Sequence, residues 1–129
     1  MNKYAAYIFL LLAGCSPAIS RMDRAPSPTG DMIVAAVPNE SKADPTKYRC
    51  LQLILMDHTG NTLSTIQTGA SDGQKWAVGW MKTGSIVVLQ SSDIGTQAYA
   101  AESNGFTQVM LNPEIEARAT ELKRSKYEK

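Results

Sequence analysis

The stretch KWAVGWMKTGSIVVLQSSDIGTQAYA, residues 75–100, decides the fold class, because strand signals and turn signals alternate along it. In residues 74–80, large apolar side chains alternate with small ones, so Trp76, Val78 and Trp80 fall on one face of a predicted strand. A Lys-Thr-Gly turn then leads into SIVVLQ, which is rich in the β-branched residues that strands favour. The stretch therefore predicts consecutive antiparallel strands.

The same pattern extends on both sides of this stretch. Turn signals recur about every ten residues from Asp57 onward, which is the spacing of an antiparallel meander. The segment YRCLQLILM, residues 48–56, predicts a central strand because both of its faces are apolar. The sequence therefore predicts a mainly β fold, an antiparallel β-meander of about six strands that forms a small sheet or a partial barrel.

The end of the chain has helical periodicity instead. Asn112 is a typical N-cap residue, and proline at position 113 suits the first turn of a helix. Ile115, Ala119 and Leu122 form a narrow apolar stripe at helical spacing. We expect one C-terminal α-helix over residues 113–127, which either covers one face of the sheet or projects toward a partner.

The first fifteen residues, MNKYAAYIFLLLAGC, have the pattern of a signal peptide. Lys3 precedes an apolar run of nine residues, whereas a helix needs about 20 to cross the bilayer core. The motif Leu12-Ala13-Gly14-Cys15 resembles the lipobox of bacterial lipoproteins. The resemblance implies that residues 1–14 are removed and that lipid on Cys15 holds the protein to a membrane of the cell envelope. The alternative is an ordinary secretory peptide with a chance cysteine.

The residues after the cysteine predict a tether and one domain. Ser16 stands where lipoproteins of the inner membrane often carry aspartate, so the resemblance favours the outer membrane. Residues 15–30 contain three prolines and several small polar residues, and we interpret them as the lipidated cysteine and a flexible tether. Residues 31–129 are then a single β-rich domain with the C-terminal helix.

Charge and cysteine content limit the partners that the sequence predicts. The chain has 13 basic and 12 acidic side chains, so it lacks the broad positive field that attracts nucleic acid, and we predict no nucleic-acid partner. With Cys15 used for lipid, Cys50 has no disulfide partner within the chain. We interpret Cys50 as a small buried residue in a strand; an intermolecular disulfide or a reactive thiol is the alternative.

Few residues carry catalytic or metal-binding chemistry. His58, the single histidine, lies in a predicted turn, and His58 with Cys50 supplies at most two favoured zinc ligands. We therefore predict no metal site and no cofactor. Asp57, Asp72 and Asp93 also lie in predicted turns, where aspartate commonly bonds the local backbone. They would form an acid and base pair for sugar hydrolysis only if the fold brought two of them together.

The face that carries Trp76, Val78 and Trp80 has two interpretations. Either the tryptophans pack as core beneath the C-terminal helix, or they form an exposed strip that binds a protein or a glycan. Taken together, the sequence predicts a membrane-anchored envelope lipoprotein whose small non-catalytic domain binds a protein partner, as an assembly accessory or as an inhibitor or immunity factor. The alternatives are a cell-wall enzyme that uses turn carboxylates, and a domain that binds a glycan or small ligand on the Trp76/Trp80 face.

Overall fold

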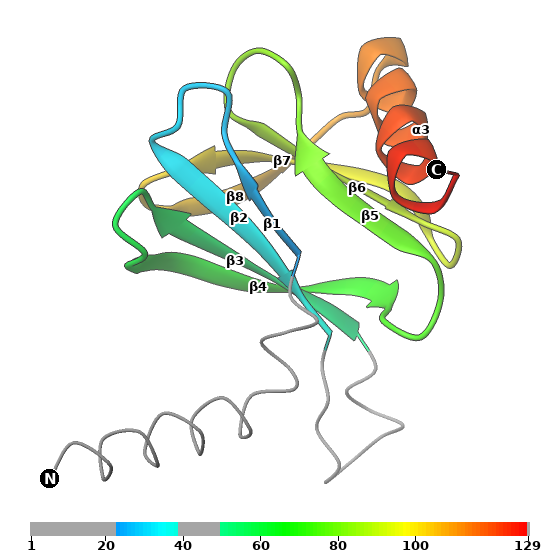
Figure 1. The fold of residues 1–129 in the computed structure, drawn as a ribbon, viewed down its shortest axis with the longest axis horizontal. Coiled ribbons are helices and arrows are strands. Elements are labelled where there is room, and N and C mark those ends of the chain that lie inside the picture. The colour runs from blue at the N-terminus through cyan, green and yellow to red at the C-terminus, as the bar shows by residue number, and fades with distance from the viewer. Residues whose placement is uncertain (1–22, 39–49, 129) are drawn as a thin grey trace, which may run out of the picture.

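The computed structural model describes residues 23–38 and 50–128, which form two four-stranded antiparallel sheets and one helix (Figure 1). The strand order is β1-β2-β3-β4 in the first sheet and β5-β6-β7-β8 in the second, so each sheet is a meander. The strands are β1 Asp23–Pro26, β2 Met32–Val37, β3 Cys50–Asp57, β4 Thr62–Ser71, β5 Trp76–Trp80, β6 Ile86–Ser91, β7 Gly95–Glu102 and β8 Gly105–Val109. The predicted mainly β fold with a C-terminal helix is confirmed. The described strands number eight, however, and they divide between two sheets that do not close into a barrel.

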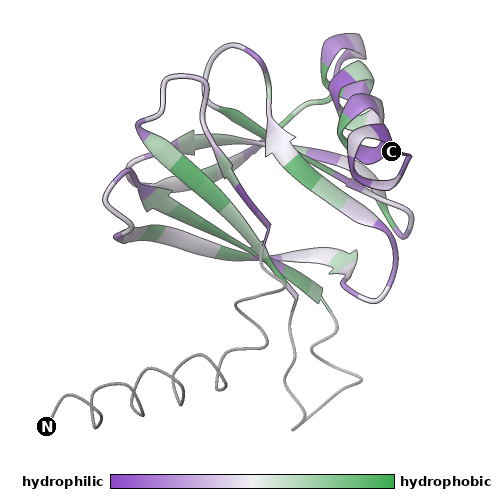
Figure 2. Cartoon of the chain, viewed as in Figure 1, coloured by the Kyte–Doolittle hydropathy of each residue, from purple (hydrophilic) through white to green (hydrophobic). Residues whose placement is uncertain are grey.

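The main core lies between the two sheets, which pack face to face. Leu51, Leu53 and Leu55 of β3 are fully buried there, and Val87 and Leu89 of β6 face them from the second sheet. Figure 2 shows hydrophobic residues concentrated along the strands and hydrophilic ones at the turns and over much of the helix. This is the period-two pattern of strands that bury one face against a second sheet.

The structure changes the boundary between tether and domain. We expected an irregular tether up to Gly30, but Asp23–Pro26 forms strand β1 and pairs antiparallel with β2, with Asp23 opposite Ala36. The sequence DRAP has no apolar alternation, so this strand forms because the edge of β2 offers hydrogen-bonding partners. The first part of the predicted tether, with Cys15, lies outside the described residues.

The helix α3, Pro113–Tyr127, has the bounds that the sequence predicts. The Asn112 side chain accepts a hydrogen bond from the Ile115 N–H at 2.8 Å, which caps the first turn. Ile115 and Ala119 are buried against Val88 and Ala98 on the outer face of the second sheet. The helix therefore covers a sheet face, which was one of the two expected arrangements.

Candidate functional site: a groove beside strand β5

Trp76 and Trp80 are core residues of the sandwich. Their side chains are only 6% and 3% exposed, and they belong to the cluster between the two sheets. The prediction that the tryptophans are buried core residues is confirmed. The prediction that they lie beneath the C-terminal helix is wrong, because the helix packs on the opposite face of their sheet. Their indole rings are therefore not exposed for a glycan to stack on, whereas Val78 is half-buried at the surface.

Strand β5 is an edge strand, and helix α3 covers part of its free edge. Just outside its two ends, the Lys75 carbonyl accepts a hydrogen bond from the Ser92 N–H and the Met81 N–H donates one to the Ile86 carbonyl, both on the β6 side. Because backbone groups alternate along an antiparallel strand, the N–H and C=O groups of Trp76, Val78 and Trp80 face away from β6, toward the free edge. A row of such groups is a place where another strand can pair.

Two side chains of α3 bond to this edge. The Tyr127 hydroxyl accepts a hydrogen bond from the Trp76 N–H at 2.9 Å and donates one to the Trp76 carbonyl at 2.8 Å. The Arg118 Nε donates a hydrogen bond to the Trp80 carbonyl at 2.7 Å. The helix thus satisfies both ends of the edge, and Val78 lies between the two covered positions.

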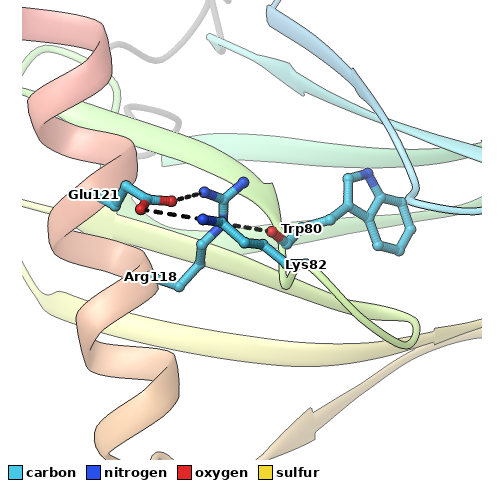
Figure 3. Close-up of polar contacts among 4 residues, drawn as sticks. All are labelled: Trp80, Lys82, Arg118 and Glu121. Carbon is cyan, nitrogen blue, oxygen red and sulfur yellow. Dashed lines mark hydrogen bonds and ion pairs between the residues drawn. The ribbon is translucent and has the colours of Figure 1, made fainter.

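The Arg118 side chain is held by a small charge network (Figure 3). Arg118 also bonds to Glu121, and the Glu121 carboxylate lies 3.5 Å from the Lys82 ammonium. The hydrogen bond from Arg118, followed by the charge of Lys82, lowers the pKa of Glu121. In Figure 3 the Trp80 indole points away from the helix, and its Nε1 donates to the Ala25 carbonyl of β1 at 2.7 Å. This last bond joins the two edge strands β1 and β5.

A groove runs between β1, β5 and α3. It consists of two open depressions of about 410 and 330 Å³ that share Val78 and Leu122. At one end Lys126 pairs with Asp23 at 2.9 Å, and its ammonium lies 3.2 Å from the centre of the Trp76 ring. The groove therefore has an apolar floor and a charged rim, which suits a polypeptide segment. Its lining consists of Asp23, Arg24, Ala25, Pro26, Pro28, Ala77, Val78, Gly79, Trp80, Met81, Lys82, Arg118, Leu122, Ser125 and Lys126.

The structure brings Asp72 and Asp93 to the same end of β4 and places Asp57, the third turn carboxylate that the sequence singled out, at the other end. Asp57 bonds within its own turn, where hydrogen bonds from the Thr59 side chain and then the Asn61 backbone lower its pKa to about 2. Asp93 accepts a hydrogen bond from the Ser71 N–H at the other end of β4, next to Asp72. Because β4 has ten residues, Asp57 lies about 30 Å from this end, beyond the separation of a glycosidase pair.

The other candidate residues occupy ordinary positions. His58 is exposed in the turn between β3 and β4. Cys50 is a free thiol at the start of β3, as expected for a strand residue, but it is partly exposed, so its interpretation as a buried residue is wrong. Across residues 23–38 and 50–128, three or more His, Cys, Asp or Glu side chains nowhere gather as a metal site would require. Within the same ranges no helix has the length and apolar character needed to cross a membrane.

Sequence reasoning missed the polar and charged helix residues that contact strand β5. Arg118, Lys126 and Tyr127 lie outside the apolar stripe, and nothing local indicates that they reach the backbone or the rings of β5. We compared the chain with models of protein families, with curated proteins and with solved structures, and none of them matches it.

Proposed function

We propose that this chain is a lipoprotein of the bacterial cell envelope that holds a small, non-catalytic domain at a membrane, where the domain binds a protein partner. The signal-peptide pattern and the motif that ends at Cys15 support the membrane anchor. Ser16 favours the outer membrane. The partner is a component of an envelope assembly, or an incoming protein that the domain inhibits or neutralises.

The groove beside β5 is the observation that carries the binding of a protein. Val78 presents its backbone N–H and C=O at the free edge of the strand, and apolar side chains form the floor around it. An extended segment of a partner would bond to Val78 and place a side chain against Leu122, in the manner of strand addition. Tyr127 and Arg118 cover the edge on either side, so the segment in contact would be short.

Photo-crosslinking in cells tests this site. Ser125 is exposed and lines the groove, and it would be replaced by benzoylphenylalanine in the full, lipidated chain. Thr107 is exposed on β8, outside the groove, and carries the same probe as a matched control. We expect a discrete crosslinked protein from position 125 and none from position 107. Identical products from both positions, or no discrete product from position 125, would overturn binding at the groove.

The anchor has its own test. Cys15→Ser removes the sulfur that would carry lipid, so the variant should stay unprocessed or leave the membrane fraction. Normal maturation and membrane fractionation of this variant would overturn the lipoprotein proposal. The proposal that a partner binds in the groove would be unaffected. The two results can therefore be read independently.

A further inference from the structure

The described part of the chain begins beside the C-terminal end of α3. Asp23, the first residue of β1, forms the 2.9 Å ion pair with Lys126 in the last turn of the helix. Only residues 16–22 separate Asp23 from Cys15, and a fully extended chain of that length spans about 27 Å. If Cys15 carries lipid, this corner of the domain stays close to the membrane surface.

Basic side chains from two elements gather at this corner. The last two turns of α3 contain Lys123, Arg124 and Lys126, and Arg124 is exposed. Lys75, just before β5, places its ammonium 5.3 Å from the centre of the Tyr127 ring, and Lys126 lies at the same distance from that ring. We call Lys75, Lys123, Arg124 and Lys126 the basic corner.

The charge balance of this corner is positive and that of the opposite end of the helix is negative. The basic corner, with Arg24 beside it, carries five basic side chains against four nearby carboxylates, which are Asp23, Asp72, Asp93 and Glu128. The first turn of α3 carries two carboxylates, Glu114 and Glu116, whereas Glu121, just past the middle of the helix, bonds to Arg118 and lies 3.5 Å from Lys82. The helix dipole accounts for the carboxylates in the first turn of α3 and for the basic side chains in its last turn. It does not account for Lys75, which belongs to the turn before β5.

We propose that the basic corner lies against anionic lipid headgroups of the membrane that holds the anchor, and so orients the domain. This inference rests on the proposed lipid anchor. A tether of this length holds the corner at a high effective concentration near the headgroups, so a modest charge excess is sufficient. In this orientation the turns at residues 27–31 and 57–61, at the far ends of β1 and β3, point away from the membrane.

Lysine acetylation of the lipidated protein in vesicles tests the inference. The protein is reconstituted in phosphatidylcholine vesicles with or without phosphatidylglycerol, treated with an acetylating reagent and analysed lysine by lysine by mass spectrometry. We expect Lys75 and Lys123 to react several-fold more slowly with phosphatidylglycerol present, and high salt to restore their reactivity. Lys82, whose side chain is 73% exposed beside the middle of α3 and outside the basic corner, should react equally in both vesicles.

Each failure has a distinct meaning. A protein that does not float with either kind of vesicle would overturn the anchor itself. A protein that floats but shows equal acetylation in both vesicles would overturn the membrane contact while leaving the anchor intact. Inorganic phosphate added to phosphatidylcholine vesicles should give no protection; protection equal to that of phosphatidylglycerol would identify a site for free anions and overturn the membrane contact.

A charge reversal with a matched control completes the experiment. Arg124→Glu should abolish the lipid-dependent protection of Lys75, whereas Thr107→Glu, which adds a negative charge on β8 outside the groove and the basic corner, should leave it unchanged. Both positions are on the surface, and far-UV circular dichroism checks that both variants keep the fold. Full protection of Lys75 in the Arg124→Glu variant would overturn the proposal.

Discussion

Replacing Tyr127 by phenylalanine tests whether one hydroxyl group fastens the end of α3 to the edge of β5. That hydroxyl bonds to both the N–H and the carbonyl of Trp76, at 2.9 and 2.8 Å. Phenylalanine keeps the ring and therefore keeps its position between the ammonium groups of Lys75 and Lys126. The substitution thus removes two hydrogen bonds and little else.

The expected loss of stability follows from these two bonds. A typical intramolecular hydrogen bond contributes a net stabilisation of about 0.5–1.5 kcal/mol. Trp76 is only 6% exposed, so water can replace the hydroxyl in part only, and the free energy of unfolding should fall by about 1–3 kcal/mol. Each 1 kcal/mol lowers the melting temperature of a domain of about 100 residues by about 4–8 °C.

Urea unfolding measures the loss, and amide hydrogen exchange locates it. The exchange of the Trp76 amide should accelerate more than that of Val87 in the core strand β6. Tyr99→Phe is the matched control, because it removes a single 2.7 Å hydrogen bond between the hydroxyl and the Gln97 side chain and should cost about half as much. A loss no larger than that of the control, with unchanged exchange at Trp76, would refute the fastening role of Tyr127.

Three further substitutions probe other contacts. Gly79→Ala would place a Cβ 2.5 Å from a Leu122 methyl group and should cost about 1–3 kcal/mol in urea unfolding. Gly69→Ala, whose Cβ would lie 3.8 Å from an Ile94 methyl group, should be nearly neutral. The pKa of Asp57 is lowered from 3.8 to about 2, so Asp57 stabilises the fold above pH 4, and this stabilisation is lost as the pH falls toward 2. Asp57→Asn should flatten this acid dependence of the unfolding midpoint, and an unchanged dependence would contradict the assignment. The buried Gln90 Oε1 has no hydrogen-bond partner within the described structure, so Gln90→Met should raise stability by about 1 kcal/mol; a lower midpoint would contradict this.

Elements with strong local signals could be predicted from the sequence. The helix has its cap, its proline and its apolar stripe within a few residues, and its bounds of 113–127 are those expected. The strands after residue 57 were also placed to within a few residues because glycine-containing turns separate them.

Features that depend on contacts distant in sequence could not be predicted. Strand β1 lacks apolar alternation and exists because β2 pairs with it, and the turn between β4 and β5 does not reveal that the chain passes to a second sheet there. Period-two alternation put Trp76 and Trp80 on one face correctly, but it could not tell the core between the sheets from the face beneath the helix. The groove depends on the same long-range packing.

The pairing of β1 with β2 also determines how the domain would bear mechanical load. In a chain held by lipid on Cys15, a pull on a bound partner reaches the membrane through β1. A pull directed along the strand from Asp23 would shear the ladder of four residue pairs between β1 and β2 and load its hydrogen bonds together instead of opening them one at a time. The ion pair of Asp23 with Lys126 and the bond from Trp80 to Ala25 lie on the same path and would share this load. The short edge strand would therefore act as the mechanical joint between the anchor and the folded domain.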